Sequence, residues 1–295
     1  MLKRTLVFSS PVILLLKDQQ LVSAYKDFPE EKRTVPIEDI GVVLLENQQT
    51  SISLPLLNAL VENDVQVVVC NSKGIPNAMI QSMNSNNLQG ETLRKQMACS
   101  QALKKQLWKQ VVEAKIKNQA ALLCSVGEDS NLLKSFYSNV RSGDVDNREG
   151  IAARIYFQHL FGESFVRDRN ETGINSLLNY GYSILRAATC RAIVSSGLLP
   201  AIGIHHHNRS NAYPLADDLM EPFRPFTDSV VYDLAMRGCL DLTKDVKSEL
   251  ISVLYIDTMY EKVKRPLSVG LSMTTASFVK CLSKEKSKIS MPVFP

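Results

Sequence analysis

About the first 85 residues of the chain alternate short apolar runs with polar connections, a pattern typical of β-strands. Residues 5–8 and 12–16 form two such runs on either side of a Ser-Ser-Pro turn, and residues 41–45 and 65–70 are rich in β-branched side chains. Between the last two runs, residues 54–63 place apolar side chains at helical spacing. We therefore predict a small β-rich region with one intervening helix.

Beyond a polar, glycine-containing segment at residues 84–90, the apolar spacing becomes helical. From Leu93 to Ile116 apolar residues recur at three- to six-residue steps, and neither Gly nor Pro appears before about Ser125. This stretch predicts one long helix or two in series. Further helices are expected over residues 131–138, 149–161, 174–195 and 229–236, with more beyond Asp245.

The two patterns together predict an α+β protein with two domains. Residues 1–88 form a small N-terminal β-rich domain, and residues 89–295 form a larger, mainly α-helical domain that ends in a lysine-rich tail at 280–288. The net charge is −2 over residues 1–90 and +6 over the rest, so a polyanion would bind to the second domain. Because many basic faces are merely solvated, charge alone indicates such a partner only weakly.

The N-terminus has some features of a secretory signal peptide, because Lys3 and Arg4 precede an apolar run. Ser9-Ser10-Pro11 interrupts that run and Lys17 closes it, so two short strands fit better. No apolar run is long enough to span a bilayer, and the six scattered cysteines form no C-x-x-C pair. With 45% hydrophobic and 22% charged residues, we expect a soluble cytoplasmic protein with reduced cysteines and no membrane contact.

Candidate chemistry lies in the second domain. Three of the four histidines form the triplet His205-His206-His207, and His206 precedes Glu221 by 15 positions. Glu149 lies in the first turn of a predicted helix, after the capping residues Asp146 and Asn147. One histidine and two glutamates from distant segments would make an oxygen- and nitrogen-ligated site for a divalent metal ion.

Each of these features also has a plain structural interpretation. Glu149 would favourably interact with the helix dipole even without a metal. The triplet would fit an ordinary surface loop, in which alternation places His205 and His207 on one side and His206 on the other. The acidic residues near Pro222 would cap a helix. No P-loop and no G-x-S-x-G motif is present, which disfavours ATP hydrolysis and serine-hydrolase chemistry.

Four ordered segments, at residues 147–157, 175–182, 203–208 and 216–225, resemble the CRISPR integrase family, CRISPR-associated protein 1, in its type II form. Residues 107–119 resemble the first long helix of that family, and the resemblance extends to about Lys247. It implies a dimerising N-terminal β-rich domain and a helical catalytic domain. It also implies the catalytic metal ligands Glu149, His206 and Glu221, with Asp218 as a further acidic residue near the metal. A slip of one residue would move the ligand to His205 or His207.

The activity that the resemblance implies is integration of prespacer DNA into the repeat edges of a CRISPR array by transesterification, with Mn²⁺ or Mg²⁺. The implied partners in the prokaryotic cytoplasm are double-stranded DNA, a second copy of the chain, and CRISPR-associated protein 2 in a heterohexamer. The resemblance to type II relatives also implies an effector nuclease and, in some subtypes, a ring-shaped DNA-binding accessory protein as partners. Candidate phosphate contacts are Arg148, Arg154, Arg167, Arg169, Arg186, Arg209 and Arg224.

Two other functions fit the same residues. A metal-dependent nuclease acting on branched or single-stranded DNA in repair would use the same three ligands with water as the nucleophile. A DNA-binding scaffold would use the acidic cluster only for structure.

Overall fold

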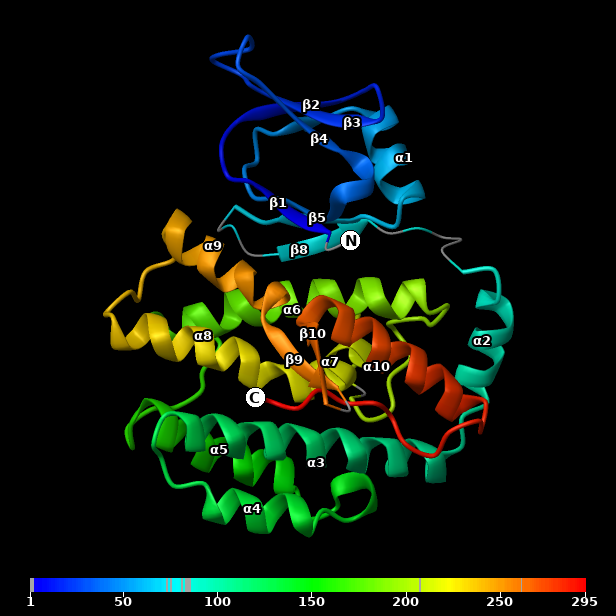
Figure 1. The fold of residues 1–295 in the computed structure, drawn as a ribbon, viewed down its shortest axis with the longest axis vertical. Coiled ribbons are helices and arrows are strands. Elements are labelled where there is room, and N and C mark those ends of the chain that lie inside the picture. The colour runs from blue at the N-terminus through cyan, green and yellow to red at the C-terminus, as the bar shows by residue number, and fades with distance from the viewer. Residues whose placement is uncertain are drawn as a thin grey trace. The chain divides into compact units, whose positions relative to one another are not determined.

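The computed structural model describes residues 3–72, 74, 76–80, 82, 86–206, 208–260 and 262–295. The chain divides into two compact units, Met1–Asn87 and Leu88–Pro295 (Figure 1). This division lies one residue from the predicted domain boundary. The first unit contains strands and the second is mainly helical, which confirms the predicted α+β fold class.

The described part of the first unit contains two four-stranded sheets. One has the order β1-β5-β7-β8, in which β1, β5 and β7 are parallel and β8 is antiparallel. The other has the order β4-β3-β2-β6, in which β2 and β6 are parallel. The strands are β1 (Arg4–Phe8), β2 (Val12–Lys17), β3 (Gln20–Tyr25), β4 (Lys32–Pro36), β5 (Ile40–Leu45), β6 (Ser51–Ile52), β7 (Gln66–Cys70) and β8 (Pro76–Ile80).

The four predicted strands and the predicted helix of this unit are confirmed. The run at 41–45 becomes β5, which is buried along its whole length, as expected for an internal parallel strand. The helix is α1 (Leu54–Glu62), and it begins after Ser53, whose hydroxyl accepts a hydrogen bond from the Leu56 N–H. The two runs around the Ser-Ser-Pro turn are strands of different sheets, so the turn carries the chain from one sheet to the other.

The second unit begins with two helices in series. They are α2 (Gln89–Met97) and α3 (Gln101–Ser125), and the break occurs because Ser100 caps α3 by accepting a hydrogen bond from the Leu103 N–H. The later helices are α4 (Asn131–Ser138), α5 (Arg148–Phe161), α6 (Ile174–Ser195), α7 (Pro214–Met220), α8 (Arg224–Met236), α9 (Lys244–Ser252) and α10 (Leu267–Leu282). The predicted helices at 131–138 and 174–195 have the observed bounds, whereas α8 begins five residues before the predicted 229.

One feature near the end of the chain differs from expectation. A hairpin of β9 (Asp257–Tyr260) and β10 (Val263–Pro266) was not predicted, because each strand is only four residues long. The lysine-rich segment at 280–288 begins within α10, and Lys284, Lys286 and Lys288 are exposed. Beyond this segment the chain packs against the unit, since Ile289 is buried and Val293 pairs with Met259.

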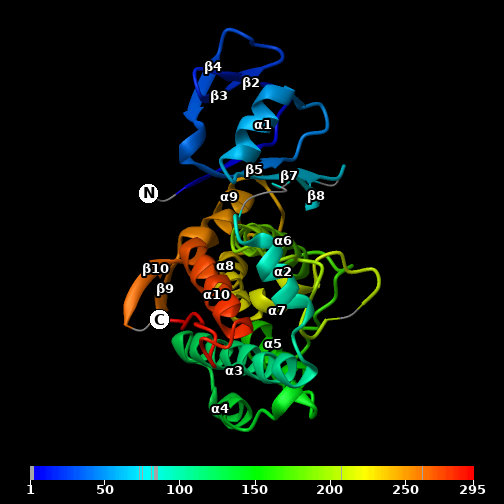
Figure 2. The ribbon, with the colours of Figure 1, turned by 90° about the vertical axis from the view of Figure 1, so that its right-hand side faces the viewer.

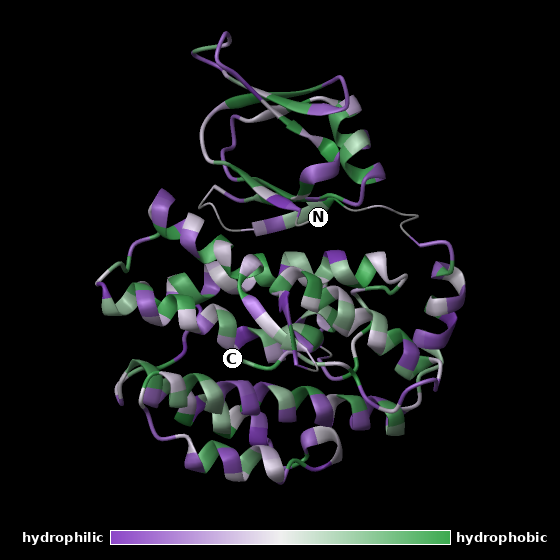
Figure 3. Cartoon of the chain, in the orientation of Figure 1, coloured by the Kyte–Doolittle hydropathy of each residue, from purple (hydrophilic) through white to green (hydrophobic). Residues whose placement is uncertain are grey.

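Helix α3 contacts α4, α5, α7 and α8 and the short 3₁₀ turn Glu221–Phe223, called η3, so it connects most of the helical unit (Figures 1 and 2). Figure 3 shows hydrophilic positions along α3. The polar residues Lys115, Asn118 and Gln119 of this helix are buried. Buried polar side chains require hydrogen-bond or ion-pair partners. Lys115 and Asn118 each have a partner in η3, which is part of the candidate site. No described helix is long and apolar enough to cross a membrane.

Candidate active site

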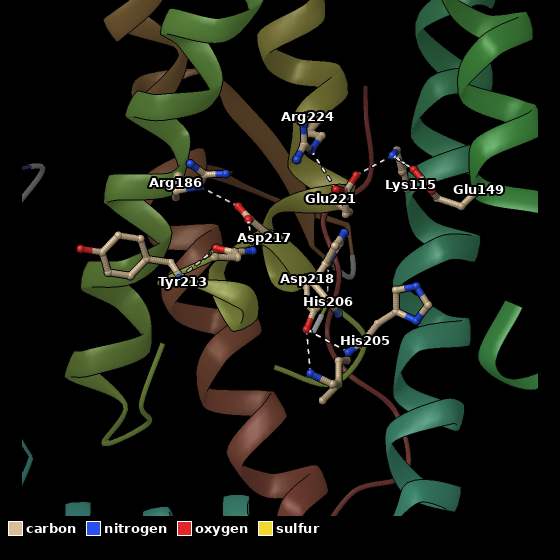
Figure 4. Close-up of polar contacts among 12 residues, drawn as sticks. Lys115, Glu149, Arg186, His205, His206, Tyr213, Asp217, Asp218, Glu221 and Arg224 are labelled. Atoms are coloured by element: carbon tan, nitrogen blue, oxygen red, sulfur yellow. Dashed lines mark hydrogen bonds and ion pairs between the residues drawn. The ribbon is translucent and has the colours of Figure 1, made fainter. Parts of the chain in front are cut away.

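A buried carboxylate organises the loop that contains the histidines. Asp218 of α7 has no exposed surface, and its Oδ2 accepts the backbone N–H groups of Ile204 and His205 at 2.7 and 3.1 Å (Figure 4). Its Oδ1 accepts the His206 N–H at 3.1 Å and lies 2.7 Å from His206 Nδ1. A Cβ at Gly203 would lie 2.8 Å from Oδ2, so only glycine allows the loop to approach the carboxylate this closely.

The rings of His205 and His206 have different environments. The bond to Asp218 raises the pKa of His206, although burial opposes this. It engages Nδ1 and leaves Nε2 for another partner. The His205 ring stacks on Trp108 with centroids 4.1 Å apart, and the His206 ring makes an edge contact with the same Trp108 at 5.6 Å. Both rings therefore lie against one residue, so the predicted alternation is wrong for these two residues. His207 lies outside the described residues.

The two candidate glutamates converge on one lysine (Figure 4). Lys115 Nζ of α3 lies 2.5 Å from Glu221 Oε2 of η3 and forms a second ion pair with Glu149 Oε1 of α5. Arg224 Nε lies 3.0 Å from the other oxygen of Glu221. Burial alone would raise the pKa of Glu221, but Arg224 and Lys115 outweigh it and lower that pKa. Burial likewise disfavours the charge of Lys115, and the two carboxylates reverse this and raise its pKa.

Glu149 is held at its helix start by a residue that sequence reasoning missed. Asp144 accepts the backbone N–H groups of Arg148 and Glu149 at 2.9 and 3.0 Å. Asn147 has a left-handed backbone with φ of 51° and makes no capping bond through its side chain, so the predicted capping role of Asn147 is wrong. Asp144 satisfies these N–H groups, so the carboxylate of Glu149 is not needed as a cap. It pairs with Lys115 in addition to any interaction with the helix dipole.

Two carboxylates that converge on a cation, with an imidazole nearby, suit Mn²⁺ or Mg²⁺ in donor chemistry. Among the described residues, however, no three His, Cys, Asp or Glu side chains lie close enough together to hold a metal ion. The cation between Glu149 and Glu221 is the Lys115 ammonium. Asp218, suggested by sequence as a possible ligand, uses both oxygens for the loop and His206, which is the position of a carboxylate that orients a metal-binding histidine.

Three of the seven candidate arginines have partners within the unit. Arg186 Nε lies 2.6 Å from Asp217 Oδ1, and Arg224 pairs with Glu221. Arg167 donates to the amide oxygens of Asn175 and Asn179. The structure therefore gives these three side chains a structural use, and their predicted contact with DNA stays a prediction.

The other four arginines differ in exposure. Arg154, Arg169 and Arg209 are exposed, and Arg148 is half-buried with its guanidinium 5.3 Å from the centre of the Phe136 ring. Exposed arginines are the ones best placed to contact phosphate groups. Their role in DNA binding also stays a prediction.

A buried network behind Arg224 was also missed by sequence reasoning. Asp228 accepts hydrogen bonds from the hydroxyl groups of Tyr156 at 2.9 Å and Tyr182 at 2.5 Å. Burial raises the pKa of Asp228 to about 6, although both tyrosines favour its charged form. Arg224 lies over the Tyr182 ring, 4.5 Å from its centre. Asp228 thus holds Tyr182 in place, and the Tyr182 ring packs against Arg224, the residue that pairs with Glu221.

With this geometry established, comparisons with known proteins identify the family. The family model for CRISPR associated protein Cas1 matches residues 6–263. The chain belongs to this family. A "CRISPR-associated endonuclease Cas1" of Neisseria meningitidis serogroup C (strain 8013) is 38% identical over 262 residues, covering 88% of this chain and 86% of the relative.

Solved structures have the same fold. A "Casposase bound to integration product" matches with a TM-score of 0.79 at 21% identity, covering 98% of this chain and 93% of the casposase chain. A "Cas6-RT-Cas1--Cas2 complex" matches with a TM-score of 0.76 at 19% identity, covering 98% of this chain and 36% of that larger chain. The resemblance seen in the sequence motifs is thus confirmed, and the relative from Neisseria is named as an endonuclease.

Proposed function

We propose that the chain is the metal-dependent integrase of a type II CRISPR system, which inserts the 3′-hydroxyl ends of prespacer DNA into the repeat edges of the array. The observation that carries this proposal is the convergence of Glu149 and Glu221 on a single cation position. The family membership gives that position its chemistry. The casposase that shares this fold was solved bound to an integration product, which supports strand joining over simple cleavage.

Glu149, Glu221 and His206 would hold Mn²⁺ or Mg²⁺, which supplies Lewis-acid stabilisation of phosphoryl and leaving oxygens when bound. Asp218 keeps the proton on Nδ1 of His206, so that Nε2 is the nitrogen presented to the ion. Arg224 holds Glu221 from the opposite oxygen and keeps it ionised. The exposed Arg154, Arg169 and Arg209 would contact the DNA backbone without reading its sequence.

The reaction is a phosphodiester exchange. The 3′-oxygen of the prespacer forms a bond to the phosphorus at the repeat edge, and the bond from that phosphorus to the 3′-oxygen of the target strand breaks. The proton lost by the attacking hydroxyl is balanced by the proton gained by the leaving oxygen. No ATP and no covalent enzyme intermediate are required, in keeping with the lack of a P-loop in the sequence.

The proposed assembly contains two homodimers, formed through the N-terminal units, on either side of a dimer of CRISPR-associated protein 2. The matching Cas6-RT-Cas1--Cas2 complex, in which a chain of this fold occurs together with Cas2, supports the second partner. The effector nuclease and the ring-shaped accessory protein of type II systems are further proposed partners. The assembly would work in the prokaryotic cytoplasm, where its DNA substrates are.

The test is strand joining in vitro. The purified chain is incubated with Mn²⁺ and a branched DNA that mimics a half-finished integration product, with and without CRISPR-associated protein 2. We expect religated strands that disappear in Glu149→Gln and His206→Ala and persist in the matched control His205→Ala. Cut but unjoined DNA would favour a nuclease, the activity for which the Neisseria relative is named. DNA binding without chemistry in both mixtures would favour a scaffold.

A further inference from the structure

Lys115 is the residue of the site that sequence motifs do not assign. Its ammonium forms ion pairs with the two carboxylates that the proposed function uses as metal ligands. The Lys115 side chain is 7% exposed and Glu221 is 5% exposed, so water does little to screen this pair, whereas Glu149 is 28% exposed. The three residues lie on α3, α5 and η3, so Lys115 links these three segments through its two ion pairs.

Two like-charged carboxylates that face one position, one of them buried, repel each other unless a cation lies between them. Lys115 supplies that cation for Glu149 and Glu221. Arg224 cannot replace it, because Arg224 pairs with Oε1 of Glu221, whereas Lys115 pairs with Oε2. The two cations around Glu221 therefore have separate positions, and only the position of Lys115 is shared with Glu149.

A divalent ion held by both glutamates needs this same position. An ammonium and a metal ion cannot occupy it together, since each would repel the other at contact distance. Resting on the proposed function, we propose that Lys115 is a built-in counter-cation that competes with the divalent ion for Glu149 and Glu221. Lys115 keeps the two ligands together when the ion is absent, and its ammonium must leave the position when the ion binds. Lys115 thereby lowers the affinity of the site for metal.

The test compares metal affinity between lysine variants of the full-length chain. Mn²⁺ binding is measured by titration calorimetry for the wild type, Lys115→Met and Lys115→Gln, and circular dichroism establishes which variants are folded. Lys117→Met is the matched control, because Lys117 lies on the same helix and is exposed. We expect both Lys115 variants to bind Mn²⁺ at least about tenfold more tightly than the wild type, and the control to be unchanged.

A measurement on the unmodified protein covers the case in which neither variant folds. An amine-specific acylating reagent is applied with and without Mn²⁺, and labelling of each lysine is quantified by mass spectrometry. Displacement of Lys115 from its ion pairs should increase its labelling relative to Lys117 when the metal is added. An unchanged ratio would contradict the competition.

The outcomes separate this inference from the proposed function. If folded Lys115 variants bind Mn²⁺ no more tightly than the wild type, while Glu221→Gln loses binding, the metal site stands and the competition is wrong. If the wild type and every variant fail to bind Mn²⁺, the proposed metal site fails and the competition fails with it. Tighter binding in either folded Lys115 variant supports both.

Discussion

The Oδ1 atom of Asp218 accepts hydrogen bonds from the backbone and from the ring of His206, at 3.1 and 2.7 Å. A single buried oxygen thus fixes both the position of the loop and the rotation of the imidazole. The remaining oxygen of Asp218 holds the two preceding N–H groups. His206 is therefore oriented before any ligand arrives, which is the arrangement that favours tight metal binding.

Replacing Asp218 by Asn should weaken Mn²⁺ binding by about 10- to 100-fold, because the ring of His206 loses its charged partner. The same change should lower the pKa of His206, which Asp218 raises through a hydrogen bond and its charge. Since only the neutral imidazole binds a metal ion, affinity falls as pH drops through that pKa, and in Asp218→Asn this fall should occur at lower pH. Calorimetry over a pH series and NMR titration of the imidazole measure the two effects. An unchanged pH dependence would exclude His206 as a ligand.

Helices α6 and α8 approach each other at a glycine. A Cβ at Gly181 would lie 2.4 Å from Cγ2 of the buried Thr227, which is closer than any real contact. Gly181→Ala should therefore lower the free energy of unfolding by about 1–3 kcal/mol, despite the better helix propensity of alanine. Urea denaturation measures this change.

The rescue variant for this contact is Thr227→Ser, which removes Cγ2. In that background, Gly181→Ala should cost little or should stabilise the helix, because the clashing methyl group is gone. The same loss of stability in both backgrounds would show that the cost arises elsewhere.

Asp228 should make the stability of the protein depend on pH. Its pKa is raised from the ordinary 3.8 to about 6 in the folded state, so between these values the folded chain binds more protons than the unfolded chain. The free energy of unfolding that this group contributes therefore falls as pH rises through these two values. The loss is about 3 kcal/mol by pH 7, and roughly half of that loss has occurred by pH 5. The difference in unfolding free energy between the wild type and Asp228→Asn should show this slope. Asp233→Asn, an exposed change on the same helix, should not.

Asn118 holds three parts of the second unit together. Its amide nitrogen donates to the Pro222 carbonyl at 2.7 Å and the Pro292 carbonyl at 3.1 Å, and its oxygen accepts the Phe294 N–H at 3.1 Å. Asn118→Ala leaves these groups without a partner and should cost about 2–4 kcal/mol of unfolding free energy. It should also expose the segment after residue 282 to proteases. Asn131→Ala, at an exposed position of α4, is the control and should change neither measurement.

Local periodicity predicts the elements of this fold well and their partners poorly. The helix at 174–195 and the strand at 41–45 follow directly from apolar spacing, because each buries one face or its whole length. A strand of four residues, such as β9, offers too few positions for a pattern. Nor does a local pattern show that α10 is followed by a segment packed beside α3, since that packing depends on contacts between residues more than 170 positions apart.

In the candidate site, too, individual residues could be predicted from the sequence, whereas their contacts could not. Residue type and resemblance point to Glu149, His206 and Glu221, and the structure places the two glutamates around one cation position. Lys115 was missed because a lone lysine on a helix is usually exposed. Its neighbours Val111, Val112 and Ile116 are all buried, and that apolar setting is the signal that could have identified it.

The contacts of Asn118 also bear on how the protein is made. The turn that contains Glu221 is tied through Asn118 to residues 292 and 294, which are synthesised last of the segments that meet there. While those residues are still inside the ribosome, a nascent chain lacks one of the connections that hold this turn against α3. The turn that contains Glu221 therefore acquires this connection only after translation has passed residue 294.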